Sequence, residues 1–263
     1  MPIFGPQTRF PYLPNAAYIP QDATPEDYAR MLRAIGCERA VLVQPSVYGT
    51  DNSAMVDALR SGVFAFRGIA VVDAAITDRE LEGLHEAGVR GVRINLASAT
   101  PGLTLAEAPR LASRIKALGW HLQFFMDLRK LPDAEEKLGS LDIDLVIDHF
   151  GKVRTDEGLD APAFQTLLRL VKRENVWAKL IGPYFLSDRA PNYEDVTPLA
   201  RAVVAAAPDR VVWGTDWPHP AVAHLPVTMP NDGDLADFML EWVPDEGQRT
   251  KVLADNPARL YGF

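Results

Sequence analysis

The stretch Asp144-Leu145-Val146-Ile147-Asp148-His149 places three branched apolar residues between two carboxylates. A short apolar run with polar residues at both ends is typical of a strand that is buried on both faces. Strands of this kind belong to parallel sheets that are covered by helices. The stretch therefore predicts a parallel α/β sheet with polar side chains where the strand ends.

Six similar runs flank this stretch, and each is followed by a longer segment with helical spacing. They are Ala40–Gln44, Phe66–Val72, Gly91–Asn95, His121–Phe125, Val176–Leu180 and Val211–Trp213. Thr24 before a proline, and Thr77 and Thr104 three residues before a glutamate, are typical of helix N-termini. We further expect Pro2–Gly5 to form the stub of an eighth strand.

Two architectures fit this alternation of strands and helices, a closed barrel and an open doubly wound sheet. The open sheet usually carries a G-x-G-x-x-G phosphate loop after its first strand, and the chain has no such motif. Its 263 residues suit one barrel of roughly 250 residues. We therefore predict an α/β fold, a (β/α)8 TIM barrel with a truncated first strand, in a single domain over residues 1–263.

The composition excludes several classes of function. With 27 basic and 35 acidic residues the net charge is −8, which argues against binding nucleic acid. The single cysteine, Cys37, can form no disulfide within the chain. No apolar stretch approaches the ~20 residues of a membrane span, and residues 1–6 lack the features of a signal peptide. We therefore expect a cytoplasmic protein that acts on a small molecule.

Polar side chains gather where the predicted strands end, which is where barrels of this type place reactive groups. Asp216 follows one strand and precedes a Pro-His-Pro loop, which favours a general base, and His149 directly follows another. The candidate substrate-binding residues are Arg93, Ser46, Tyr48, Thr50, Asn52, Gln123, Lys179, Tyr184 and His219. The structural alternatives are that Asp216 caps a turn, that His149 is a core histidine and that Arg93 only pairs with a carboxylate.

Several motifs resemble the amidohydrolase superfamily, in the branch of 2-pyrone-4,6-dicarboxylate, sugar and muconolactone lactonases. They are Gln44–Asn52, Arg90–Asn95, Gly119–His121, Ile147–Gly151, Trp213–Pro220, Met229–Gly233 and Asp255–Tyr261. The likeness extends over essentially the whole chain. It implies a (β/α)8 barrel that hydrolyses a small carboxylate-bearing lactone in aromatic or sugar acid catabolism, without a required metal or other cofactor.

The resemblance also implies roles by position. Asp216 corresponds to the base that takes a proton from water, and His149 to a polar group near the substrate carbonyl. Arg93 corresponds to a carboxylate-binding group, and the Ser46–Asn52 loop to a wall of the pocket. These types suit lactone cleavage, which needs a base beside the attacking water and donors for the developing oxyanion.

The chain departs from the family at its start. The family begins with Asp-x-His-x-His on its first strand, and here Met1 and Pro2 stand where that motif ends. His149 and Asp216 alone are too few for a catalytic zinc site with three protein ligands, so we expect no metal site. We also expect that the start codon is misassigned or the chain truncated, which an in-frame stop codon directly upstream would contradict.

A second departure concerns the substrate. Phe185 stands where the pyrone dicarboxylate enzymes tend to carry arginine, and residues 96–99 include no basic residue. We therefore expect a lactone with fewer carboxylates, with Arg154 or Arg189 as compensating groups. Two alternatives remain open: a metal-dependent decarboxylase or hydrolase of the same superfamily, and a ligand-binding barrel with impaired catalysis. The oligomeric state is left open.

Overall fold

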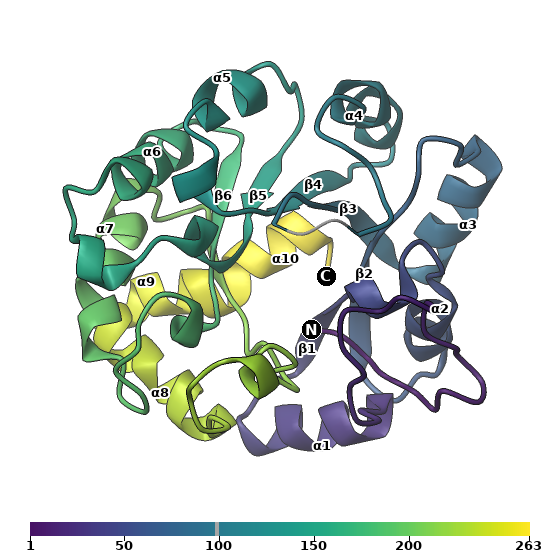
Figure 1. The fold of residues 1–263 in the computed structure, drawn as a ribbon, viewed down its shortest axis with the longest axis horizontal. Helices are drawn as coiled ribbons and strands as arrows, with labels where there is room; N and C mark the ends of the chain where they lie inside the picture. The colour runs from purple at the N-terminus through teal and green to yellow at the C-terminus, as the bar shows by residue number, and fades with distance from the viewer. Residues whose placement is uncertain (98–99) are drawn as a thin grey trace.

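The computed structural model describes residues 1–97 and 100–263 and shows one curled sheet inside a ring of helices (Figure 1). Its strands run parallel in chain order, which confirms the predicted parallel sheet. They are β1 (Arg39–Val43), β2 (Ala65–Ala70), β3 (Val89–Asn95), β4 (His121–Phe125), β5 (Leu145–Ile147), β6 (Val176–Leu180) and β7 (Val211–Trp213). The predicted boundaries of β4, β6 and β7 are confirmed, and those of the others differ by one or two residues.

Helices precede, connect and follow the strands, and most of them cover the outer face of the sheet (Figure 1). They are α1 (Pro25–Ala34), α2 (Ser53–Arg60), α3 (Asp78–Ala87), α4 (Ala108–Lys116), α5 (Ala134–Gly139), α6 (Pro162–Val171), α7 (Thr197–Ala206), α8 (Asp232–Trp242), α9 (Glu246–Thr250) and α10 (Asn256–Tyr261). None of the helices within the described ranges is long and apolar enough to cross a membrane.

The predicted helix starts are largely confirmed. Thr24 and Thr77 cap α1 and α3, and each belongs to a capping box. The expectation for Thr104 is wrong, because its contact with Glu107 forms in a turn and α4 begins only at Ala108. Pro109 explains the later start, since a proline is tolerated only in the first turn of a helix.

Alternation along each strand sends one set of side chains outward to the helices and the other set inward. On β4, Leu122 and Phe124 belong to the apolar layer that packs under the helices. Inside the sheet, a second apolar cluster of β-strand residues includes Leu260 and Tyr261 of α10. In Figure 1 the yellow α10 accordingly lies within the ring of helices. This apolar cluster fills part of the interior of the sheet, and the polar side chains lie toward the C-terminal ends of the strands.

The expected strand stub at Pro2–Gly5 is not found. Phe4 instead pairs with Ala23 in an isolated antiparallel bridge. Met1 takes the place beside β1: its amine donates to the Val41 carbonyl at 2.8 Å, and its carbonyl accepts from the Val43 N–H at 2.9 Å. These two bonds are those of a parallel strand pair, so the contact with the sheet lies at residue 1.

Candidate active site

Five predicted side chains lie on or directly after strands β3 to β7; four of them are buried and Arg93 is half-buried. They are Arg93 on β3, Gln123 on β4, His149 after β5, Lys179 on β6 and Asp216 after β7. Arg93 and Gln123 are register partners on adjacent strands, so their side chains lie at the same level of the sheet. The structure therefore brings these five groups to one end of the strands.

A buried ion pair forms the floor of this group. The Lys179 amine donates to Gln123 Oε1 at 2.9 Å and lies 3.3 Å from Asp148 Oδ1. The Gln123 amide in turn donates to Asp148 Oδ2 at 2.7 Å. Burial raises the pKa of Asp148, but the positive charge of Lys179 outweighs it and the pKa lies below its ordinary value. Asp148 is therefore an ionised carboxylate that is already paired.

His149 stands on a strained turn. Residues His149, Phe150, Gly151 and Lys152 all have positive φ angles, between 48° and 63°. Left-handed backbone costs about 1–2 kcal/mol for each non-glycine residue, and such strain concentrates at functional sites. The turn points the imidazole inward, where its Nε2 lies 3.8 Å from Asp148 and from Asp216.

Burial decides the charge of His149. The ring is 5% exposed and packs edge-on against Phe125 and Phe185. Desolvation lowers the pKa of His149, and the nearby carboxylates offset this only partly. Among the described residues its Nδ1 has no hydrogen-bond partner. His149 is therefore a neutral imidazole at neutral pH.

Asp216 also has a left-handed backbone, with φ of 61°. Its Oδ2 accepts a short hydrogen bond from the Tyr184 hydroxyl, and its N–H contacts the Met1 sulfur at 3.0 Å. Its Oδ1 faces His149 at 3.8 Å, which is too long for a direct hydrogen bond. One carboxylate oxygen is thus held, and the other faces an imidazole across a gap.

Two cations flank one aromatic ring at the same end of the sheet. The Arg93 guanidinium lies 4.7 Å from the centre of the Phe125 ring, and the Lys152 amine lies 5.1 Å from it. Lys152 also contacts the ring of Phe185 at 4.8 Å, and burial lowers its pKa. Arg93 keeps its Nε unpartnered within the described part of the chain. Both cations are placed to meet an anionic group.

The loop after β1 contributes less than its sequence suggests. Ser46 lines a small cavity of about 10 Å³ together with Arg93. Tyr48 is buried and accepts a hydrogen bond from the Gly5 N–H, and Asn52 pairs through its amide with the backbone of Val71. Thr50 lines a surface groove beside α2 and α3. Of these four predicted residues, the structure brings only Ser46 to Arg93.

Tyr184 and His219 lie behind Asp216. Tyr184 stands on a short 3-10 turn after β6, and burial and the charge of Asp216 raise its pKa well above the ordinary value. Its hydroxyl also lies 3.1 Å from Nδ1 of His219, whose Nε2 lies 3.1 Å from Asp232. Both ring nitrogens of His219 therefore have protein partners.

The amine of Met1 is buried beside the same cluster. Burial and, to a lesser extent, the charge of Lys179 lower the pKa of this amine to about 4. A cavity of about 370 Å³ extends from Met1 between β1 and β7 and is lined by residues that include Lys179 and Trp213. The amine is thus neutral at neutral pH and lies at one end of an open space.

The donor set does not suit a metal site of three protein ligands. Within residues 1–97 and 100–263 no three His, Cys, Asp or Glu side chains are grouped to hold a metal ion. His149 and Asp216 provide two ligands, and Tyr184 already engages one oxygen of Asp216. A catalytic zinc site ordinarily has three protein ligands.

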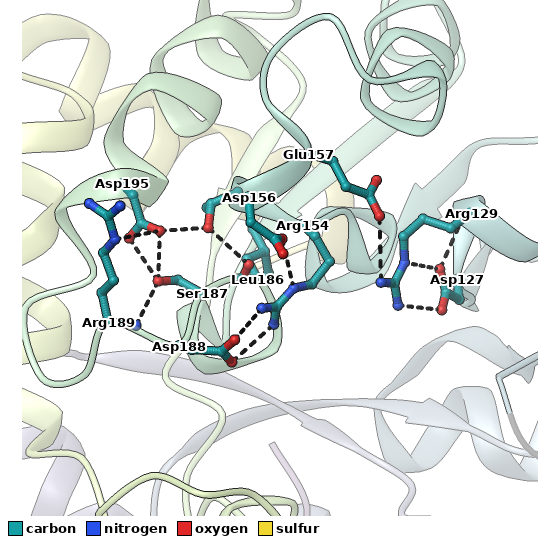
Figure 2. A network of polar contacts seen from close by, with 11 residues as sticks. Asp127, Arg129, Arg154, Asp156, Glu157, Leu186, Ser187, Asp188, Arg189 and Asp195 are labelled. Carbon is teal, nitrogen blue, oxygen red and sulfur yellow. Dashed lines mark hydrogen bonds and ion pairs between the residues drawn. The ribbon is translucent and has the colours of Figure 1, made fainter.

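The two arginines expected to compensate for Phe185 are engaged elsewhere (Figure 2). Arg154 pairs with Asp156 at 3.2 Å and with Asp188 at 2.5 Å. Arg189 lies 3.8 Å from Asp195. Figure 2 shows both within one network of loop carboxylates. Their charges are therefore already balanced by these partners.

Sequence reasoning missed Lys152, Phe125 and Asp232. Lys152 lies three residues after His149, so the rule that polar groups after strands face the mouth could have found it. Phe125 ends β4 and points inward by the same alternation as Gln123. Asp232 belongs to the Met229–Gly233 motif of the family resemblance, but it was not assigned to the site, because acidic residues are common in the first turn of a helix.

Known proteins are similar to this chain over nearly its whole length. The family model described as amidohydrolase matches residues 1–263. A 4-sulfomuconolactone hydrolase from Hydrogenophaga intermedia is 38% identical over 262 residues, which cover 99% of this chain and 86% of that protein. A 2-pyrone-4,6-dicarboxylate hydrolase from Comamonas testosteroni is 40% identical over 272 residues, covering 98% of this chain and 87% of that protein.

Solved structures show the same fold. The crystal structure of a probable 2-pyrone-4,6-dicarboxylic acid hydrolase from Acinetobacter baumannii with citric acid bound superposes with a TM-score of 0.84. The two sequences are 28% identical, and the match covers 100% of this chain and 97% of the other.

Proposed function

Because this chain belongs to the amidohydrolase family, we propose that it hydrolyses a small carboxylate-bearing lactone with a water molecule that Asp216 activates. The gap of 3.8 Å between Asp216 Oδ1 and His149 Nε2 is the observation that carries the proposal. A reacting water and carbonyl oxygen need a base and a donor that face each other without bonding directly. The names of the relatives support a lactone as the substrate.

The proposed reaction assigns one task to each group. Oδ1 of Asp216 takes a proton from water while the water oxygen bonds to the lactone carbonyl carbon. The carbonyl oxygen takes the π electron pair and receives a hydrogen bond from Nε2–H of neutral His149. The oxyanion then re-forms the C=O bond while the ring C–O bond breaks, and the ring oxygen keeps the electron pair of that bond and receives the proton from Asp216. The product is an open hydroxy acid or its keto tautomer.

We assign Arg93 and Lys152 to the carboxylate of the substrate. Both cations lie against Phe125, and Arg93 offers a fork of N–H donors that matches a carboxylate. Phe185 presents an apolar ring beside His149, and residues 98–99 lie outside the described part of the chain. The expectation of fewer carboxylates than in the pyrone dicarboxylate therefore stays a proposal, as does binding by Ser46, Gln123 and Lys179.

We also propose that the fold is a single-domain (β/α)8 barrel over residues 1–263. Met1 pairs in parallel with β1, and the cavity of about 370 Å³ lies between β1 and β7, the two strands that an eighth strand would join. The family match over the whole chain supports one domain. In this arrangement Met1 occupies the position of an eighth strand beside β1.

A panel of lactones tests the function. Muconolactones, pyrone carboxylates, sugar acid lactones and neutral lactones are incubated with the wild type, Asp216→Asn and Asp209→Asn, and acid release is measured. Asp209 pairs with Lys251 on the surface, so its variant controls for charge. Loss of the base is expected to lower the rate about 10²–10⁴-fold. A rate unchanged in Asp216→Asn for every hydrolysed lactone would overturn the proposal.

A chelator series tests metal independence separately. We expect the lactonase rate to be unchanged after exhaustive dialysis against a chelator, because in the proposed reaction Asp216 and His149 act without a metal ion. Activity that vanishes on chelation and returns with zinc would favour the metal-dependent alternative. A protein that binds carboxylates in calorimetry but opens none of the lactones would favour the ligand-binding barrel.

A further inference from the structure

Behind the base, four side chains form a continuous line of contacts. Oδ2 of Asp216 accepts from Tyr184, the Tyr184 hydroxyl lies 3.1 Å from Nδ1 of His219, and Nε2 of His219 lies 3.1 Å from Asp232. His219 is 3% exposed, and the Asp232 side chain is 18% exposed. The line thus runs from the proposed reaction centre to the partly exposed first residue of α8.

A count of protons shows what this line requires. Three contacts need three donated protons. The tyrosine hydroxyl supplies one and a neutral imidazole supplies one, while ionised carboxylates supply none. With two protons, one contact would bring two lone pairs together in a buried place, which is unfavourable. A third proton on the imidazole completes all three hydrogen bonds.

We propose that Asp232 keeps His219 as an imidazolium. Its Nδ1–H then donates to the Tyr184 oxygen, so the Tyr184 hydroxyl donates its own proton to Asp216. The inference rests on the proposed function, because it makes His219 and Asp232 positioning residues for the base. Tyr184 then holds Oδ2 of Asp216 at all times, and Oδ1 stays directed at His149 and the water. Neither residue touches the substrate in this arrangement, which differs from the substrate-binding role expected for His219.

The titratable groups around His219 come from three segments. Asp232 faces it from α8, Tyr184 from the turn after β6, and Asp216 lies beyond Tyr184 on the loop after β7. Asp232 is the carboxylate in direct contact, so its removal takes away the main support for the positive imidazole. A nearby opposite charge moves a titration by about 1–3 pH units.

Two measurements on Asp232→Asn test the proposal. Asp234→Asn is the matched control, because Asp234 lies in the same first turn of α8 and its loss changes the net charge equally. NMR of protein labelled with ¹⁵N-histidine reports the charge of each of the five imidazoles without substrate. The signals of His219 are assigned by comparison with His219→Gln.

We expect His219 to be charged at pH 6 to 7 in the wild type and in Asp234→Asn, and to lose its charge about one pH unit lower in Asp232→Asn. The alkaline fall of kcat/KM should move in the same direction and only in Asp232→Asn. A neutral His219 at pH 6 in the wild type, or the same titration in all three proteins, would overturn the proposal. Because NMR needs no substrate, this result is independent of whether the protein is a lactonase.

Discussion

Nε2 of His149 lies 3.8 Å from Oδ1 of Asp216, although the two residues are 67 positions apart and follow different strands. Both stand on left-handed backbone, with φ of 48° and 61°. The same conformation at two strand ends turns both side chains toward the interior of the sheet. If either residue took an ordinary backbone conformation, its side chain would turn away from the other. The backbone strain is therefore linked to the way the two side chains face each other.

The cation pair at Phe125 leads to a prediction about binding. We expect Lys152→Met to raise KM for an anionic lactone about tenfold, as the loss of a charge-assisted contact of about 1.5 kcal/mol would. The kcat is expected to stay nearly constant, because Lys152 contacts Phe125 and Phe185 rather than the reacting atoms. Steady-state kinetics on an anionic and a neutral lactone measure this.

Lys130→Met provides the control for that change. The Lys130 side chain is 81% exposed on a neighbouring loop, so the same substitution removes the same charge away from the site. Its KM should match the wild type. A Lys152→Met protein whose KM rises equally for the neutral lactone would show that Lys152 shapes the pocket instead of binding an anion.

The strands could be predicted because their signals are local. The apolar run at Leu145–Ile147 and the polar residues beside it mark a buried strand without knowledge of its neighbours. The rule that strand ends face one mouth then identified His149, Lys179 and Asp216. These predictions required only the alternation of side chains and the direction of the strands.

The remaining contacts depend on tertiary structure. The four left-handed residues from His149 to Lys152 reverse the chain and bring Lys152 back to Phe125, and no periodicity predicts such a turn. Loop side chains have no fixed direction, which explains why Asn52 binds backbone at Val71 instead of lining the pocket. The contact of Tyr184 with Asp216 likewise joins two loops that the sheet alone brings together.

The floor of the site predicts strong energetic coupling. Lys179→Met should lower the free energy of unfolding by about 3–5 kcal/mol, because it leaves the Asp148 carboxylate buried without its cation. The double variant Lys179→Met with Asp148→Asn should recover much of this loss, since no uncompensated charge remains. Urea unfolding of the wild type, both single variants and the double variant gives the coupling energy. Additive losses would show that the two charges are independent, against their separation of 3.3 Å.

His121 predicts a loss of stability in acid. Burial, and then the charge of Lys179, lower its pKa from 6.5 to about 3. The folded protein therefore binds fewer protons than the unfolded chain between these values, and stability falls as the pH drops from 6.5 toward 3. The titration of His121 alone lowers the free energy of unfolding by roughly 4 kcal/mol over that pH range. Above pH 6.5 it has no such effect.

The variant His121→Phe removes this titration and keeps a ring against Tyr261. Urea unfolding should show a smaller loss of stability between pH 7 and pH 4.5 than in the wild type. At pH 7 the variant should be at least as stable, because both nitrogens of His121 lack partners among the described residues. Parallel pH dependences in the two proteins would place the acid sensitivity elsewhere.

Gly182 tests whether the position of His149 limits the rate. A Cβ at residue 182 would lie 2.8 Å from Nδ1 of His149, and Gly182 has a φ of +63°. Gly62 has a similar φ of +71°, but a Cβ added there would have nothing within 4 Å. Gly62→Ala therefore loses stability only through the unfavourable backbone conformation. Gly62→Ala should lose about 1 kcal/mol of stability from the backbone alone. Gly182→Ala should lose more, because its Cβ also displaces the His149 ring. Only Gly182→Ala should also lose kcat, by tenfold or more, because small misplacements of a catalytic group are costly. Equal kcat values in the two variants would mean that His149 can shift without harm, which would contradict its proposed role at the carbonyl oxygen.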